Sequence, residues 1–154
     1  MSARARTRFG MGPLYLDALA EARRRGDRRV GTDHIALAML RDPDSDTARA
    51  LGFSLDSART ALQTLDSEAL ATLGIDAPFV AVATATRTRE RLSLTPAARA
   101  IFTGLRRVAA GERLGPKHVL LALLGQQRPD PAAELFDALG VDRDVVRARL
   151  APAL

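Results

Sequence analysis

Cysteine is absent from the 154-residue chain, and so are tryptophan and any long apolar run. Without cysteine the protein can form neither disulfides nor thiolate metal sites, and this composition suits a reducing compartment. No apolar stretch approaches the roughly 18 residues that cross a bilayer, and no apolar core follows the N-terminal arginines as in a secretion signal. We therefore expect a soluble, cytoplasmic protein with no membrane partner.

The motifs of common enzymes are missing as well. The sequence contains no Gly-x-x-x-x-Gly-Lys-Ser/Thr loop for nucleotide phosphates, no Gly-x-Ser-x-Gly nucleophile elbow and no His-Glu-x-x-His zinc pair. The only two histidines, His34 and His118, are far apart in the chain, and neither has a second histidine at ligand spacing. The sequence thus predicts neither an enzyme nor a bound metal or cofactor.

The residues that are abundant favour helices. Hydrophobic residues make up 47% of the chain, but aromatic residues only 4%. Alanine, leucine and arginine dominate, and these residues lose little conformational freedom on entering a helix. A chain of this length and apolar content can fill one compact core. We therefore expect an all-α fold.

The net charge of +5 is confined to one end of the chain. Residues 1–30 hold eight arginines against three acids, whereas residues 31–154 hold 15 basic and 15 acidic residues. We expect residues 1–12 to form a basic, flexible tail. A nucleic-acid-binding regulator is one open alternative, although the only aromatic residue beside the arginines of residues 1–12 is Phe9, which argues against stacking on bases. Its contacts would come from Arg4, Arg6, Arg8, Arg23, Arg24 and Arg25.

A ten-residue segment occurs twice in the chain. Residues 31–40 (GTDHIALAML) and residues 115–124 (GPKHVLLALL) share five identities at an offset of 84 positions. Each copy carries one of the two histidines at the same position, just before the apolar run. A segment repeated at a fixed interval indicates duplicated units that stack on each other.

Capping residues, prolines and glycines predict four helices in each half. In the first half Thr32 is the expected cap of the second helix, and Ser54 that of the fourth. In the second half Thr95 and Asp142 cap the first and last helices. The expected helices cover residues 13–25, 32–40, 47–51 and 54–63, then 95–111, 116–124, 131–139 and 142–150.

These elements predict the domain organisation: a first repeat at 13–65, a second at 95–150, and a short tail at 151–154. Within the intervening stretch, 66–94, we expect one or two helical turns capped by Asp66 or Ser67 and stopped at Gly74. The remainder, 76–94, is rich in Val and Thr but has no visible partner strand, so we interpret it as a surface tether. A peptide-docking edge is the alternative interpretation of this segment.

Several short motifs occur in the same order in both halves. The first half contains Gly31-Thr32-Asp33-His34, Ala50-Leu51-Gly52 and Ala58-Arg59; the second contains Thr95-Pro96-Ala97-Ala98, His118, Ala138-Leu139-Gly140 and Val146-Arg147. This doubled pattern, from about Leu14 to Leu150, resembles the amino-terminal domain of the Clp (Hsp100) unfoldases, especially the ClpC and ClpA branch. The resemblance implies two pseudo-twofold-related four-helix repeats packed as one globule, here a free-standing recognition module without the ATPase motor.

The resemblance to ClpC-type domains implies a pocket for phosphorylated arginine in each repeat. There, the acid of the Gly-Thr-acid-His motif pairs with the guanidinium, and hydroxyls and amides at helix starts hold the phosphate. The resemblance implies ligand-binding roles for Thr32, Asp33, Thr95 and Lys117. Asp33 retains the acid, one methylene shorter than the usual Glu. In the second copy Lys117, the only lysine, replaces it and would repel a guanidinium, so that pocket is expected to be lost or to prefer an anion.

Simpler structural roles are open for the same residues. Asp33 can complement the dipole at the start of its helix without binding any ligand. His34 and His118 are expected to be structural, using their ring nitrogens to secure the starts of their helices, because two isolated imidazoles do not complete a metal site.

The resemblance implies binding of client proteins or peptides, phosphoarginine or cyclic peptide ligands, and a ClpC-type unfoldase as a further partner. The protein would deliver such clients to the protease system or sequester them from it. A purely structural interaction module, which binds an unfoldase or itself without a ligand pocket, is the main alternative.

Overall fold

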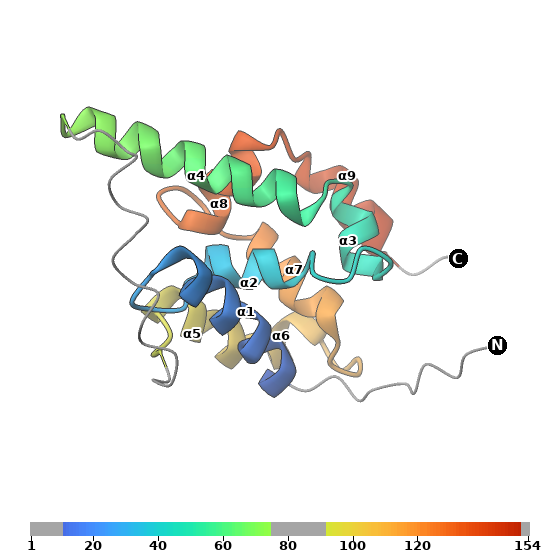
Figure 1. Ribbon diagram of the computed structural model, residues 1–154. Coiled ribbons are helices and arrows are strands. Elements are labelled where there is room, and N and C mark those ends of the chain that lie inside the picture. Colours follow the sequence, from blue (N-terminus) through green and yellow to red (C-terminus); the bar gives the residue numbers. More distant parts are fainter. Residues whose placement is uncertain (1–10, 75–91, 152–154) are drawn as a thin grey trace.

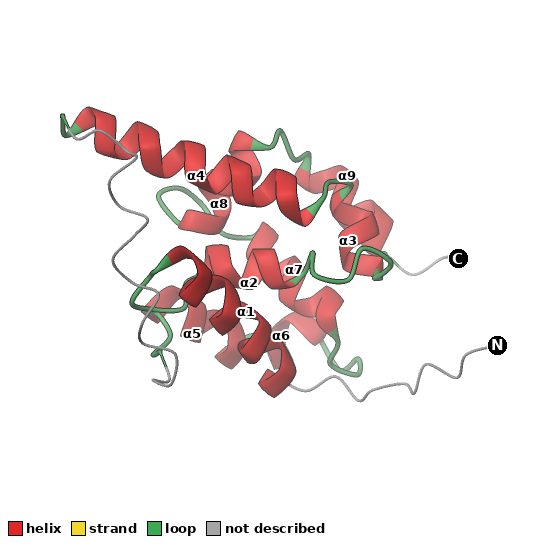
Figure 2. Cartoon of the chain, viewed as in Figure 1, coloured by secondary structure: helices red, strands yellow, loops and turns green. Residues whose placement is uncertain are grey.

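The computed structural model describes residues 11–74 and 92–151 (Figures 1 and 2). All the elements named in this part of the chain are helices, as predicted. The first repeat contains α1 (Met11–Arg25), α2 (Thr32–Ala38), α3 (Asp46–Leu51) and α4 (Leu55–Thr72). The second contains α5 (Pro96–Thr103), α6 (Leu105–Ala109), α7 (Pro116–Leu124), α8 (Pro131–Ala138) and α9 (Arg143–Leu150). No helix within the described residues is both long and apolar enough to cross a membrane.

Side-chain caps begin most of these helices where the sequence predicts. A hydroxyl or carboxylate accepts a backbone N–H of the first turn and so satisfies a donor that the helix itself leaves unpaired. Glycines in the left-handed conformation close the elements, for example Gly52 (φ 78°) after α3. The capping residues are Ser45 for α3, Ser54 for α4, Thr95 for α5, Asp130 for α8 and Asp142 for α9.

The two repeats pack on each other reciprocally, as a pseudo-twofold requires. Helix α2 of the first repeat packs against α8 of the second, and α7 packs against α3 in the same way; α4 on α8 and α9 on α3 form a second matched pair. In Figure 1, α2 and α7 lie in the middle of the molecule, between α4 on one side and α1, α5 and α6 on the other. One continuous core results, with its largest fully buried side chains from both repeats: Ile35, Leu37, Leu105, Leu120, Leu123, Leu124, Leu135 and Phe136.

Helix α4 is longer than predicted. The expected end near Gln63, with a new cap at Asp66 or Ser67, is wrong: one helix runs unbroken from Leu55 to Thr72, and Gly74 follows with φ 76°. No glycine or proline interrupts this stretch, so helix propagation outweighs the local capping preference of Asp66. The carboxylate of Asp66 instead accepts a hydrogen bond from Arg25 at 2.6 Å, and this ties α4 to the end of α1.

Three further boundaries differ from the prediction. The long helix expected at 95–111 is broken at Gly104 into α5 and α6, because glycine is the weakest non-proline helix former. Helix α1 begins at Met11, inside the stretch expected to be a tail. Gly31, and not Thr32, is the N-cap of α2.

A single parallel β-bridge joins the two repeats beside α5. The amide of Val30 donates to the carbonyl of Ser93, and the amide of Thr95 donates to the carbonyl of Val30, both at 2.9 Å. Tyr15 adds a hydrogen bond from its hydroxyl to the carbonyl of Leu92 at 2.6 Å. The end of the predicted tether therefore does find a partner. Residues 1–10 and 75–91, on which the predicted flexible tail and most of the tether fall, lie outside the described residues.

Candidate functional site

The repeated Gly-x-x-His segment forms the same hydrogen bond at the start of α2 and of α7. The amide of Gly31 donates to Nδ1 of His34 at 2.8 Å, and the amide of Gly115 donates to Nδ1 of His118 at 3.0 Å. Each imidazole thus satisfies the N-cap amide of its own helix.

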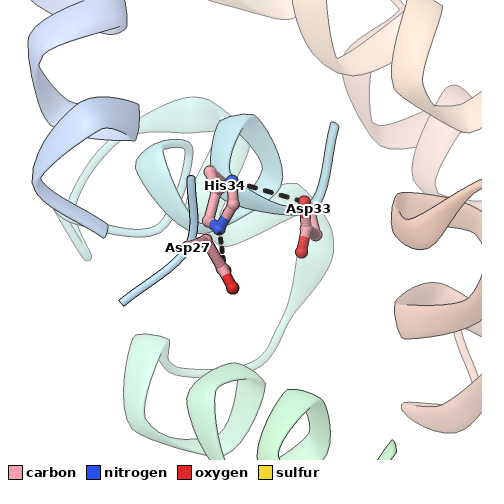
Figure 3. A group of neighbouring side chains, drawn as sticks. All are labelled: Asp27, Asp33 and His34. Carbon is pink, nitrogen blue, oxygen red and sulfur yellow. Dashed lines mark hydrogen bonds and ion pairs between the residues drawn. The ribbon is translucent and has the colours of Figure 1, made fainter. Parts of the chain in front are cut away.

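His34 connects this helix start to the loop that follows α1. Nδ1 accepts a hydrogen bond from the Gly31 amide, so the ring proton is on Nε2. Nε2 donates to Oδ2 of Asp27 at 2.6 Å (Figure 3). Burial alone would raise the pKa of Asp27, but the hydrogen bond from His34 and the charge of Arg25 outweigh it, and the pKa is lowered. Asp27 is therefore a stably ionised anchor for the ring.

Asp33 lies on the other side of the imidazole and is buried, with 9% of its surface exposed. Its Oδ1 is 3.5 Å from Nδ1 of His34 (Figure 3), but that nitrogen already accepts a hydrogen bond from the amide of Gly31. Burial raises the pKa of Asp33; His34 and Arg25 partly offset this rise, and the nearby Asp27 adds to it. Within the described residues, no side chain donates a hydrogen bond to this carboxylate.

Gly31 makes room for the Asp33 carboxylate. A Cβ at Gly31 would lie 2.6 Å from Oδ1 of Asp33, closer than any real contact allows, and 3.7 Å from the methyl carbon of Thr95. The backbone of Gly31 is extended (φ −102°), so it is this close approach, and not a left-handed backbone, that favours glycine here. Asp33 and Thr95 thus meet across Gly31.

An open cavity of about 480 Å³ extends from this point between α1, α4 and α8. Its lining carries both signs of charge. Arg28 and Arg29 are exposed and Glu134 is half-buried, and none of the three has a charged partner among the described residues. A carboxylate next to guanidinium groups can bind a dipolar ligand, with a cation on one side and an oxyanion on the other. The charged and hydroxyl-bearing lining residues are Arg25, Asp27, Arg28, Arg29, Asp33, Asp66, Thr95 and Glu134.

The structure brings together two of the four residues expected to bind ligand. Asp33 and Thr95 line the same cavity. Thr32 does not line this cavity and contacts the start of α8. Its buried hydroxyl donates a hydrogen bond to Oδ1 of Asp130 at 2.8 Å and accepts one from the amide of Ala132 at 3.2 Å. Lys117 belongs to the second repeat and makes an ion pair with Glu112 at 2.8 Å.

The second repeat has the same hydrogen bond at its helix start, but one of the two charged positions changes sign. The motif position of Asp33 is taken by Lys117, and the loop acid is Glu112, whose pKa is lowered by Lys117 and then by His118. Oε2 of Glu112 lies 3.4 Å from Nε2 of His118, a contact that does not satisfy this buried nitrogen as a hydrogen bond. The two sites are thus related by geometry but differ in the charge they would attract.

Asp27 and Glu134 are site residues that the sequence alone did not reveal. Asp27 directly follows Gly26, and Glu112 directly follows Gly111; both glycines are left-handed, with φ 74° and 89°. An acid directly after the left-handed glycine that precedes each Gly-x-x-His segment was therefore a usable signal. Glu134 has no such signal, because only the packing of α8 against α2 and α4 brings it to the cavity.

One atom of each of Asp27, Asp33 and His34 lies within 4.8 Å of the others, a spacing that could suit a metal ion (Figure 3). Both nitrogens of His34 are already engaged, however, by the Gly31 amide and by Asp27. An ion would have to displace one of these bonds, so the cluster as arranged holds the helix start and not a metal.

Comparison with known proteins supports the fold. The chain is similar to the N-terminal domain of the caseinolytic protease associated chaperone ClpD from Arabidopsis thaliana, with a TM-score of 0.63 and 16% sequence identity over 97% of this chain and 96% of that one. No protein-family model and no curated protein matches the sequence. The likeness confirms the expected fold: the chain has the architecture of a Clp N-terminal domain.

Proposed function

We propose that this protein is a non-catalytic recognition module of the Clp protease system, which binds clients or adaptors through the cavity at Asp33. Its ligands are peptide segments that present a guanidinium beside an oxyanion, with phosphoarginine as the leading candidate. The fold supports a role in protein recognition, since the similar domain belongs to a protease-associated chaperone. The sequence contains no nucleotide-binding P-loop, so these residues would not hydrolyse ATP themselves.

The buried carboxylate of Asp33 carries this proposal. An acid that is 9% exposed, with a raised pKa and no side-chain donor among its described neighbours, is stabilised when a cation arrives. A guanidinium offers two parallel N–H donors to such a carboxylate. The phosphoryl group of the same ligand would then face Arg28, Arg29 and the start of α5 at Thr95.

Calorimetric titration with free phosphoarginine and with a phosphoarginine peptide tests the proposal. We expect one binding site per chain, with binding abolished by Asp33→Asn, a substitution that keeps the shape and removes the charge. Asp46→Asn is the matched control, because Asp46 is also a first-turn acid but is exposed and lies on α3. Equal losses in the two variants would mean that Asp33 acts only on its helix, and the pocket proposal would be wrong.

One observation favours the structural alternative. Three of the four expected ligand residues already have polar partners within the chain. Thr32 donates a hydrogen bond to Asp130, Lys117 forms an ion pair with Glu112, and the Thr95 hydroxyl accepts a hydrogen bond from the amide of Ala98. Polar side chains that are paired within the chain are expected of a module that binds an unfoldase or another copy of itself without a ligand pocket. No heat with either ligand, together with co-elution of a purified ClpC-type unfoldase with both the wild type and Asp33→Asn, would favour it.

A further inference from the structure

A second cavity, of about 570 Å³, opens beside the Val30–Leu94 bridge. Its lining runs along α5 from Pro96 to Thr103 and includes Arg29 from the loop between α1 and α2. Two arginines, Arg29 and Arg99, line it together with the hydroxyl-bearing Ser93 and Thr103. Leu94, Pro96 and Ala100 add apolar surface.

The charge around this cavity has one sign. Residues 92–111 include Arg99, Arg106 and Arg107 and not a single acid. Arg29 and Arg99 are exposed, and neither forms an ion pair with any described residue. Arg59 and Arg143, by contrast, are paired with the carboxylates of Glu21 and Asp137. The electrostatic complement of this cavity is therefore an anion supplied from outside the described chain.

The backbone beside the cavity also suits an extended ligand. Across the bridge, the amide of Val30 donates to the carbonyl of Ser93, and the carbonyl of Val30 accepts from the amide of Thr95. Because successive peptide groups of an extended chain point to opposite sides, the amide and carbonyl of Leu94 face away from Val30. No described residue forms a backbone hydrogen bond to either group. A second extended chain could pair with this edge.

We propose that this cavity binds an extended acidic segment of a partner protein, with carboxylates on Arg29 and Arg99. Alternate side chains of an extended peptide point the same way, so acids at every second position can reach both guanidinium groups. The lining contains no aromatic ring on which a base could stack, and this favours a peptide over a single-stranded nucleic acid. The site is separate from the cavity at Asp33, although Arg29 lines both.

Fluorescence anisotropy with a labelled octapeptide of alternating Glu and Val tests this site in the full chain. We expect saturable binding that is absent for the matched Gln-Val peptide, and that Arg99→Gln weakens by about tenfold. Arg113→Gln is the matched control, since Arg113 is also exposed, carries the same charge and does not line the cavity. Arg99 lines only this cavity and Asp33 only the other one. Arg99→Gln should therefore leave phosphoarginine binding unchanged, and Asp33→Asn should leave acidic-peptide binding unchanged, so failure of one proposal can be told from failure of the other.

Three outcomes would overturn the proposal. Equal weakening by Arg99→Gln and Arg113→Gln would show non-specific attraction to a positive protein. Equal affinity for the Glu-Val and Gln-Val peptides would show that the arginines are not used. Tighter binding of a single-stranded oligonucleotide of the same charge, also lost in Arg99→Gln, would reassign the site to nucleic acid.

Discussion

The two carboxylates that flank His34 are in opposite electrostatic situations. Asp27 is 38% exposed at its side chain, accepts a hydrogen bond from the ring and is close to Arg25, so its charged form is favoured. Asp33 is buried and lacks a comparable donor, so its charged form is disfavoured. The charged form of Asp27 thus stabilises the fold, whereas the charged form of Asp33 destabilises it. A buried acid with a perturbed pKa is typical of a binding site.

Replacing Asp33 with Asn should raise the stability of the unliganded protein at neutral pH by about 1–2 kcal/mol. The pKa of Asp33 is raised on folding, so the folded state binds the proton more tightly than the unfolded chain does. The contribution of Asp33 to the free energy of unfolding is therefore fully present at pH values below its usual pKa of 3.8. It is lost as the pH rises through the pKa of the folded state. Urea unfolding from pH 3 to pH 8 should show the advantage of Asp33→Asn only on the alkaline side of this window.

Asp27→Asn provides the control of opposite sign. The pKa of Asp27 is lowered on folding, so its contribution is present above the usual value of 3.8 and is lost as the pH falls through the folded pKa. We expect this variant to lose at most about 1 kcal/mol at neutral pH, because solvent screens a carboxylate that is 38% exposed. Parallel pH profiles for the two variants would contradict the assigned roles.

At the scale of elements, an ion pair fixes α4 to α1 in the first repeat. Glu21 is fully buried and accepts two hydrogen bonds from Arg59, at 2.6 and 3.1 Å, and Arg41 lies 3.5 Å from the same carboxylate. The second repeat has no counterpart, because Leu105 occupies the position that corresponds to Glu21. Arg147, which matches Arg59, instead donates to the carbonyl of Leu124 at 3.3 Å.

Removal of the arginine from this pair should be much more damaging than removal of the acid. Arg59→Met leaves the Glu21 carboxylate buried and is expected to cost about 3 kcal/mol, whereas Glu21→Met leaves an arginine that is 25% exposed and can contact water. The double variant should resemble Glu21→Met alone. Arg147→Met is the matched control and should cost less than about 1 kcal/mol in urea unfolding. Similar costs for Arg59→Met and Arg147→Met would contradict a special role for the buried pair.

The elements themselves were largely predictable from local chemistry, but the site was not. Caps such as Ser54 and Asp142, and glycines such as Gly52, act within a few residues, so the sequence shows them directly. The cavity depends on long-range contacts. Asp33 and Thr95 are 62 positions apart in sequence and meet only because the Val30–Leu94 bridge aligns their segments. Local patterns contain no information about that bridge.

At the scale of the whole molecule, each repeat supplies a surface that the other must cover. Every residue of α2 is buried, and α8 of the second repeat covers one side of it. Polar contacts reinforce this packing: Thr32 on α2 bonds the cap of α8 at Asp130, and Arg149 on α9 donates to the carbonyl of Ala50 on α3 at 2.9 Å. These contacts cross the pseudo-twofold in both directions, so the repeats share one core and should unfold together.

Either repeat expressed alone should therefore fail to fold. A fragment of residues 11–74 would expose Ile35 and Leu37, which are fully buried in the whole chain, and would lose the partner of Thr32. Repeats that cannot bury their apolar faces alone depend on their neighbours for stability. Circular dichroism should show weak helicity and no cooperative thermal transition for this fragment, while the full chain melts in one step.

Mixing the fragment with a second one, residues 92–151, separates this explanation from a simple effect of chain length. Among the described residues, the interface between the two fragments contains the reciprocal helix pairs and one bridge. We expect helicity to rise on mixing, to saturate at equimolar ratio, and to be weakened by Thr32→Val in the first fragment. An independent, cooperative transition for residues 11–74 alone would mean that the first repeat has its own core, and that the pseudo-twofold joins two domains and not two halves of one.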